Sequence, residues 1–223
     1  MSVSYILKRS KRRRSISIKV ESYTAKVKVS APMGTPLEKI NRLVLEKQDW
    51  ITRHVELMKS KNAILPKLAT GEKIYIAGKY YTLNICDCKR LSLSGSTINL
   101  PSDNYKKALI SFTKKTFLLY ATQKTAMLAK EYGFKYGSIS VGSAKNTWGT
   151  CSQAKNIIYT FALAFVPEHL CSYVILHELC HTKEMNHGKP FYKILSAVMP
   201  NHKALDKELR RYASYLRFLR EDT

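Results

Sequence analysis

The five residues His177-Glu178-Leu179-Cys180-His181 constrain this chain more than any other segment. Pro167 is a favourable first helical residue, and the helical pattern that follows it places these five residues in the third turn. Two histidines four positions apart lie on one face of a helix, where both imidazoles reach a single metal ion. Glu178 lies about 100° around the helix from His177, in a position to face a water molecule beside the metal. The segment therefore predicts a helix that carries a metal site.

A third histidine follows closely. His187 comes six residues after His181, and the segment Asn186-His187-Gly188 favours a chain turn that brings this ring back toward the helix. Glu184 is a rival ligand, but three ligands at consecutive helical steps span too much axial length, at about 1.5 Å per residue. The spacing H-x3-H-x5-H matches known zinc sites with three histidines. One coordination position then remains for water, which is typical of a catalytic site.

The expected cofactor is one zinc ion, although other divalent metals also bind such ligands. Zinc lowers the pKa of water, and Glu178 is the candidate general base that accepts the water's proton. The predicted reaction is hydrolysis, at either a carbonyl or a phosphoryl centre. The residues alone do not decide whether the substrate is attacked at a carbonyl or at a phosphoryl centre.

The net charge of +22 comes from 38 Lys and Arg residues against 16 Asp and Glu residues. Such a charge favours polyanionic substrates, nucleotides, nucleic acids or acidic proteins as partners, and a solvated basic surface explains it equally well. The segment from Lys8 to Arg14 contains six cations and no acid. It is interpreted either as a phosphate-binding arm or as the charged edge of a sheet.

Composition restricts the class of protein further. Hydrophobic residues make up 45% of the chain, which is enough to form a core. The longest apolar stretch, Ile157 to Val166, is too short to span a bilayer, so no membrane span is expected. Five cysteines at irregular spacing predict reduced thiols. The start of the chain has no apolar signal segment, and we therefore expect a cytoplasmic protein.

Periodicity and turn residues predict an α+β fold. An N-terminal β-rich region with one long helix covers residues 1–100, and a catalytic region covers residues 101–223, with both regions in one compact unit. Strands are expected at residues 15–20, 25–29, 73–77, 80–85, 90–93 and 97–100, and between 136 and 165. Helices are expected from Pro36 to Met58 with Thr35 as the cap, from Asn104 to Tyr132 with Gly133 as the stop, and over 167–183, 190–198 and 203–219.

The segment from Trp148 to Cys151 has two interpretations. In the first, it is a tight turn in which Trp148 packs under the sheet and Gly149 permits the bend. In the second, Gly149, Thr150 and Cys151 form the rim of a cleft and offer backbone groups to the substrate. Cys151 is disfavoured as a nucleophile, because zinc already activates water. The predicted strand from Ile157 to Leu163 is expected beside the cleft, where its edge pairs with an extended peptide.

The remaining candidates are aromatic residues and histidines. Tyr159 and Tyr192 are candidate donors to negative charge that develops on the substrate, with core packing and rim exposure as the alternative roles. His54, His169 and His202 are interpreted as surface or helix-end residues.

A family resemblance rests on two segments: His177-Glu178-Leu179-Cys180-His181, followed by Asn186-His187 and Phe191, and the upstream segment Trp148-Gly149-Thr150-Cys151-Ser152. With these segments the chain resembles the YgjP-like family of metal-dependent hydrolases. This family is related to the SprT-like and WLM zinc peptidases, and the similarity extends over nearly the whole chain. The resemblance implies a zincin-like core, in which a small sheet lies over the motif helix. It also implies His177, His181 and His187 as zinc ligands and Glu178 as general base. The family usually has Arg before Trp-Gly, where this chain has Thr147, so any role of that Arg does not transfer.

Three functions follow as hypotheses. The first is a zinc-dependent peptidase that acts on a peptide substrate. The second, implied by the resemblance, is a metal-dependent pyrophosphatase acting on UTP, which suits the positive net charge. The third is a nucleic-acid-associated protease, as the SprT-like relatives suggest.

Overall fold

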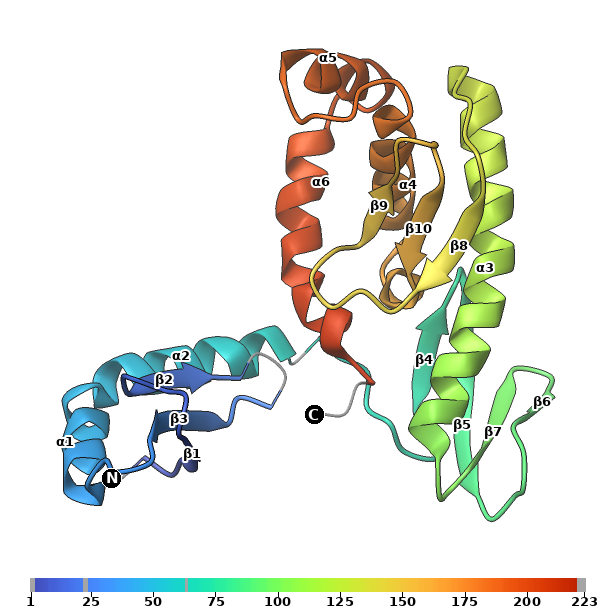
Figure 1. Ribbon diagram of the computed structural model, residues 1–223. Coiled ribbons are helices and arrows are strands. Elements are labelled where there is room, and N and C mark those ends of the chain that lie inside the picture. Colours follow the sequence, from blue (N-terminus) through green and yellow to red (C-terminus); the bar gives the residue numbers. More distant parts are fainter. Residues whose placement is uncertain (1–2, 22–23, 63, 220–223) are drawn as a thin grey trace. The chain divides into compact units, whose positions relative to one another are not determined.

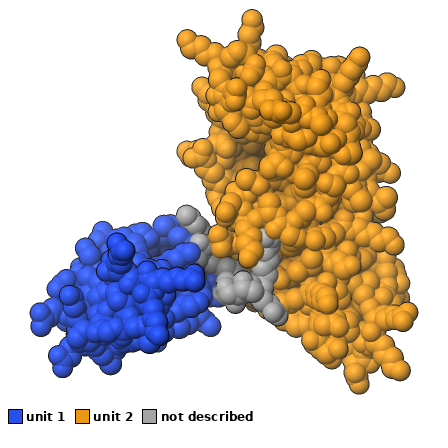
Figure 2. Space-filling model, in the orientation of Figure 1, with its two compact units in different colours: residues 1–65 blue, residues 66–223 orange. Residues whose placement is uncertain are grey.

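The computed structural model describes residues 3–21, 24–62 and 64–219. These residues form an α+β fold with three small sheets and six α-helices (Figure 1). The chain divides into two compact units, residues 1–65 and residues 66–223, which Figure 2 distinguishes by colour. Among the described helices, none combines the length and the apolar character that a bilayer crossing requires.

The first unit consists of a three-stranded sheet and two helices. In chain order these are β1 (Ile6–Ser10), β2 (Ser17–Val20), β3 (Val27–Pro32), α1 (Leu37–Glu46) and α2 (Gln48–Asn62). β3 is the central strand, parallel to β1 and antiparallel to β2. The helices pack on one face of this sheet, and the core between them contains Val20, Val27, Val29, Ala31, Ile40, Val44 and Ile51.

The helix predicted over residues 36–58 is two helices, which separate at Lys47. A continuous helix of that length extends over more than 30 Å, whereas strands of four to six residues extend over only about 13–20 Å. The break lets both helices keep their apolar residues against the short sheet. The predicted cap is also wrong by one residue, because Pro36 occupies the N-cap position and makes no side-chain cap. β1 was not predicted, since charged residues interrupt its alternation.

The second unit begins with a four-stranded sheet that contains β4 (Lys73–Ile76), β5 (Lys79–Cys86), β6 (Ser92–Ser94) and β7 (Thr97–Pro101), in the order β4-β5-β7-β6. The β4–β5 turn lies at Ala77 and Gly78, one residue earlier than predicted, and both residues have positive φ. Such turns match the twist of a hairpin. Ala77 donates its N–H to the carbonyl of Ala164 at 2.8 Å, so the hairpin belongs to the second unit. The observed boundary therefore lies at residue 65, whereas the sequence pattern suggested residue 100.

The rest of the second unit contains α3 (Tyr105–Tyr132), β8 (Ile139–Gly142), β9 (Gly149–Cys151), β10 (Ile157–Thr160), the 3-10 segment η1 (Phe161–Phe165), α4 (Glu168–His181), α5 (Lys189–Val198), α6 (His202–Leu209) and the 3-10 segment η2 (Arg210–Arg217). Gly133 ends α3 in the left-handed conformation, as predicted. The helix predicted over 203–219 is instead α6 followed by η2. Pro167 is the N-cap of α4 rather than its first residue.

The strand beside the motif helix is not the one that the sequence indicated. Strand order β8-β10-β9 makes β10 the central strand, parallel to β8 and antiparallel to β9. The predicted strand Ile157–Leu163 ends at Thr160, where η1 begins, and neither of its edges is open. β8 and β9 are the edge strands, and β9 is the one that packs against α4. α4 is apolar on nearly every side and is accordingly buried.

Candidate metal centre

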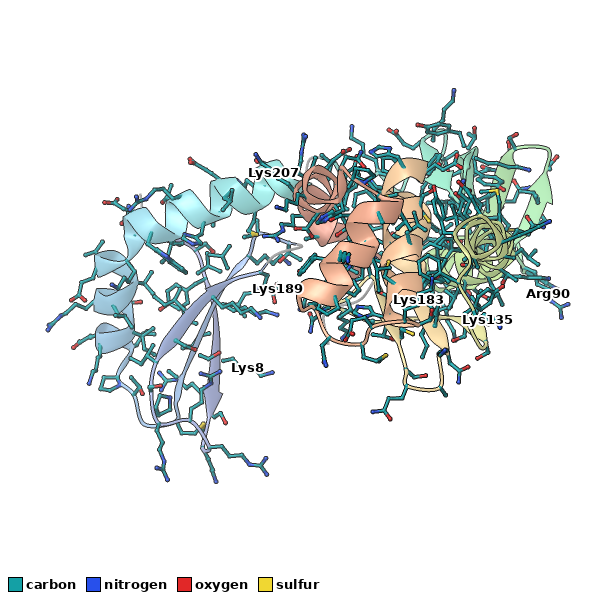
Figure 3. The ribbon with its side chains drawn as sticks, turned by 90° about the horizontal axis from the view of Figure 1, so that it is seen from above. Lys8, Arg90, Lys135, Lys183, Lys189 and Lys207 are labelled. Atoms are coloured by element: carbon teal, nitrogen blue, oxygen red, sulfur yellow. The ribbon has the colours of Figure 1, made fainter. Side chains whose placement is uncertain are left out.

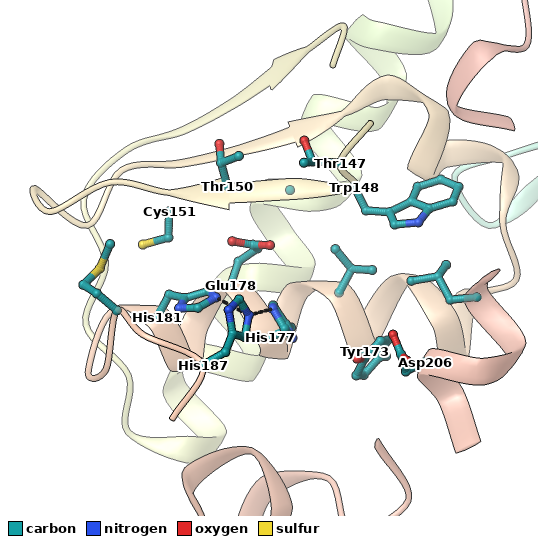
Figure 4. A pocket seen from close by; sticks show the side chains of 14 residues that line it. Thr147, Trp148, Thr150, Cys151, Tyr173, His177, Glu178, His181, His187 and Asp206 are labelled. Atoms are coloured by element: carbon teal, nitrogen blue, oxygen red, sulfur yellow. Dashed lines mark hydrogen bonds between the residues drawn. The ribbon is translucent and has the colours of Figure 1, made fainter. Parts of the chain in front are cut away.

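Three imidazole rings converge in the second unit (Figure 4). The Nε2 atom of His187 lies 3.0 Å from Nε2 of His177 and 3.2 Å from Nε2 of His181. Ligand nitrogens about 2.0–2.1 Å from a tetrahedral zinc ion lie about 3.3 Å apart. The spacing of the three rings therefore fits a single metal ion, and the histidine set expected from the sequence meets at one point.

Local structure explains this convergence. His177 and His181 are one turn apart on α4, and the helix ends at His181. The residues between α4 and α5 then reverse the chain, with Thr182 and Lys183 donating backbone hydrogen bonds to the last turn of α4. His187 lies just before the Gly188 cap of α5, which returns the chain toward α4. The ring thus reaches the other two from a separate element.

Protonation and hydrogen bonding suit these rings to metal binding. Burial, together with the neighbouring imidazoles, lowers the pKa of His177 to about 4, and burial also lowers the pKa of His181. Neutral imidazoles retain the lone pair that a metal requires. Nδ1 of His181 donates to the backbone carbonyl of Glu184 at 3.1 Å, which directs Nε2 toward the other rings. The Glu184 carboxylate accepts from the backbone N–H of Asn186 and does not join the histidines.

Phe191 packs against all three imidazole rings. Its fully buried ring is stacked on His181 with centroids 4.5 Å apart, and it lies 4.7 Å from His187 and 5.0 Å from His177. A rigid apolar contact of this kind limits the rotation of each imidazole. Phe191 is in the first turn of α5, so the element that follows the third ligand also positions the first two.

Glu178 lies beside the three histidines and is 5% exposed. Its carboxylate points from α4 toward β9 (Figure 4), and Oε2 has no hydrogen-bond partner among the described residues. Burial raises the pKa of Glu178 to about 8. A buried carboxyl group with a free acceptor and a raised pKa is suited to accept and return a proton near neutral pH.

Gly149 is the point where β9 touches Glu178. A Cβ atom at this position would lie 2.7 Å from Cγ and 2.8 Å from Oε1 of Glu178, closer than side chains approach. The residue belongs to a strand, so the bend that the sequence suggested for it is absent. The glycine is needed here for close approach between strand and carboxylate.

A cavity of about 420 Å³ opens between α4 and β9. Its lining includes Glu178, all three histidines and the segment from Thr147 to Cys151, a position that favours the cleft-rim interpretation of this segment over the tight turn. Burial raises the pKa of Cys151, and the nearby Glu178 contributes in the same direction. The Cys151 thiol therefore stays protonated near neutral pH, which agrees with the expectation that Cys151 is not the nucleophile.

A second hollow, of about 730 Å³, shares His177 and His187 with the first. Tyr192 lines it, and its ring lies 6.4 Å from the ring of His187, while its role toward a substrate stays a prediction. Tyr173 and Asp206 line both hollows, and sequence reasoning missed them. Tyr173 precedes His177 by one turn of α4, a spacing that would have identified it. Asp206 comes from α6, and no local signal connects it to the site.

Other predicted residues lie elsewhere or take different roles. Of the two roles considered for Tyr159, core packing is the one observed, because the residue is fully buried and its hydroxyl bonds Thr125 on α3 at 3.1 Å. His202 begins α6 but is 6% exposed and bonds Ser196. His169 is exposed and pairs with Glu208, as expected of a surface histidine.

The raised pKa of Glu178 predicts a pH-dependent stability of the metal-free protein. Between its ordinary pKa of 4.5 and its folded value of about 8, the folded state binds more protons, so stability falls as pH rises. His177, shifted from 6.5 to about 4, acts in the opposite direction below pH 6.5. We therefore expect the free energy of unfolding to fall by about 1 kcal/mol between pH 6.5 and 8. Thermal unfolding in chelator measures this change. The same fall in Glu178→Gln would show that another group causes it.

A helix with two histidines and a glutamate, completed by a third histidine from the next turn, defines the class of metal-dependent peptidases. The chain belongs to the YgjP-like family, whose metallopeptidase domain model matches residues 14–212. The crystal structure of the metallopeptidase zymogen of Pyrococcus abyssi abylysin is similar at 18% identity and a TM-score of 0.37, over 40% of this chain and 90% of that chain. No curated protein matches the chain.

Proposed function

We propose that this protein is a zinc-dependent peptidase in which Glu178 is the general base. One observation carries the proposal: Glu178, whose Oε2 has no hydrogen-bond partner within the described part of the chain, and the three histidines line one cavity, beside an open strand edge. Membership of a metallopeptidase family supports it. We also propose that the β8-β10-β9 sheet and α4 form a zincin-like core. The free thiols of all five cysteines support a reducing, cytoplasmic location.

His177, His181 and His187 would hold the zinc ion through their Nε2 atoms. A zinc ion held there would polarise the carbonyl of a scissile peptide bond and make a neighbouring water molecule more acidic. Glu178 accepts the proton of that water at its free carboxylate oxygen and then gives it to the departing amine. The low exposure of Glu178 keeps bulk water away from this transfer.

The edge of β9 would bind the substrate as an additional strand. On the side of β10, Trp148 accepts from Thr160 at 2.9 Å and Ser152 donates to Asn156 at 2.9 Å. Hydrogen bonding alternates along an antiparallel ladder, so the backbone groups of Gly149 and Cys151 point to the open edge. A peptide that pairs with these two residues lies along the cavity with its carbonyl groups close to Glu178.

The test is hydrolysis of an unfolded protein by the full chain. We expect the zinc-loaded protein to cleave reduced, carboxymethylated casein into new fragments, which mass spectrometry identifies by their termini. A chelator should abolish cleavage, and added zinc should restore it, because hydrolysis would depend on the zinc ion bound by the histidines and not on a covalent intermediate. Absence of cleavage by protein that contains one zinc ion per chain would refute the peptidase function.

A nucleotide pyrophosphatase acting on UTP is the second candidate, and the second hollow favours it. Lys203 and Arg210 line this hollow beside His177 and His187, and both carry positive charge. Arg210 pairs with Asp206, which leaves Lys203 for a phosphate group. Release of pyrophosphate from UTP by the zinc-loaded protein, without cleavage of casein, would select this candidate over the peptidase.

A further inference from the structure

Positive charge in the first unit is concentrated on the strands. Residues 1–34, which contain the three strands, have nine Lys and Arg residues against one acid, Glu21. Residues 35–65, which contain both helices, have six Lys and Arg residues against four acids. The strand half therefore carries a charge of +8 and the helical half a charge of +2. Solubility alone gives no reason for so unequal a division.

The strand register shows which residues share the face opposite the helices. Val29 pairs with Leu7 on one side and Ile18 on the other, and these three side chains belong to the core face. Side chains alternate along a strand, so the neighbouring rows belong to the opposite face. One such row is Ile6, Lys28 and Lys19, and the next is Lys8, Ser30 and Ser17. We call this surface the open face.

Cations surround the two serines of the open face. Lys8 and Lys19 are exposed, and Figure 3 shows Lys8 on the strand side, away from α1 and α2. Arg13, which follows β1, donates from Nη1 to the hydroxyl of Ser17 at 2.9 Å and so extends over the same surface. Lys28 forms an ion pair with Glu21. The other four acids of this unit belong to residues 35–65, in the helices on the far side of the sheet.

We propose that the open face binds the phosphate backbone of nucleic acid. Lys8, Arg13 and Lys19 supply charge for phosphates, and the hydroxyls of Ser17 and Ser30 supply hydrogen bonds between them. The rows described above contain no aromatic side chain for stacking and no amide for reading a base edge. Binding is therefore driven by phosphate contacts and has little dependence on base sequence. This function is independent of the metal centre in the second unit.

The composition of the face favours nucleic acid over an anionic membrane. Peripheral membrane proteins combine cations with several apolar side chains that enter the lipid. Ile6 is the one large apolar side chain in the two rows, and it is only half exposed, at 47%. Short hydroxyl groups next to cations are instead typical of contacts with phosphate oxygens.

The experiment compares two charge-matched variants of the full chain by fluorescence anisotropy with a labelled 20-nucleotide single-stranded DNA. The face variant is Lys8→Gln, Arg13→Gln and Lys19→Gln. The control variant is Lys39→Gln, Arg42→Gln and Lys59→Gln, which removes the same charge from exposed positions on α1 and α2. We expect the face variant to bind at least tenfold more weakly at 150 mM salt, and the control to remain within about twofold of wild type.

The salt dependence gives a second readout that folding defects do not imitate. The slope of log K against log salt should decrease in magnitude by about 2 in the face variant, because each lost phosphate contact on a single strand contributes about 0.7. Equal weakening of both variants would assign the binding to net charge and overturn the proposal. So would binding to phosphatidylserine vesicles without binding to the oligonucleotide. Unchanged thermal unfolding of both variants shows that the sheet is intact.

Discussion

Replacement of Glu178 by Gln is expected to lower the hydrolytic rate by about 10²- to 10⁴-fold. Glutamine keeps the size of the side chain and its place beneath β9, but it cannot accept a proton from water. The carboxylate is not part of the histidine cluster, so zinc content should remain at one ion per chain. The measurement is kcat on the substrate that the wild type cleaves, together with metal analysis of the same samples.

The matched control for this variant is His187→Ala, which removes a ligand and leaves Glu178 in place. We expect that variant to lose zinc and activity together, whereas Glu178→Gln loses activity alone. A Glu178→Gln enzyme that retains wild-type kcat would contradict the assignment of the general base. Loss of zinc from that variant would show instead that Glu178 holds the metal.

The second large effect is expected for Gly149→Ala. The new methyl group would lie 2.7–2.9 Å from the Glu178 side chain, so that either β9 or the carboxylate must move. Overpacking of this kind costs about 1–3 kcal/mol of stability. A displacement of about 1 Å at the general base lowers the rate by about 10²-fold. The predicted loss appears in kcat, because the three atoms nearest the new methyl group all belong to Glu178, and zinc binding should persist.

Gly34→Ala is the control for Gly149→Ala. Apart from its two chain neighbours, no atom of the described residues lies within 4 Å of the position that its Cβ would take, and its backbone needs no left-handed conformation. We expect this variant to unfold at the wild-type temperature within a few degrees and to retain full activity. If Gly149→Ala were equally silent, the close approach of β9 to Glu178 would be refuted.

The candidate site was predictable from the sequence to the extent that it is local. His177, Glu178 and His181 are placed by helical periodicity, and His187 by the turn residues that flank it. Phe191 was noted only as part of the family resemblance, and its role as a common contact of three rings required the position of α5. Asp206 comes 25 residues after His181, where only tertiary packing connects it to the site.

The fold was predictable where turn chemistry is strong. Gly133 has positive φ and ends α3, as expected, and Gly95, also with positive φ, lies in the turn between the strands predicted at 90–93 and 97–100. The order of strands was not predictable, because the apolar sequence of β10 does not indicate which strands pair with it on either side. For this reason the sequence indicated the wrong edge, and β9, with only three residues, appeared to be a turn.

The central claim is that three imidazoles hold one metal ion, and anomalous diffraction from crystals of the zinc-loaded protein tests it directly. Data collected on either side of the zinc absorption edge should show one peak per chain, about 2.0–2.1 Å from Nε2 of His177, His181 and His187. The Glu178 carboxylate should lie beyond bonding distance of that peak. A peak at other residues, or none in protein supplied with stoichiometric zinc, would contradict the account.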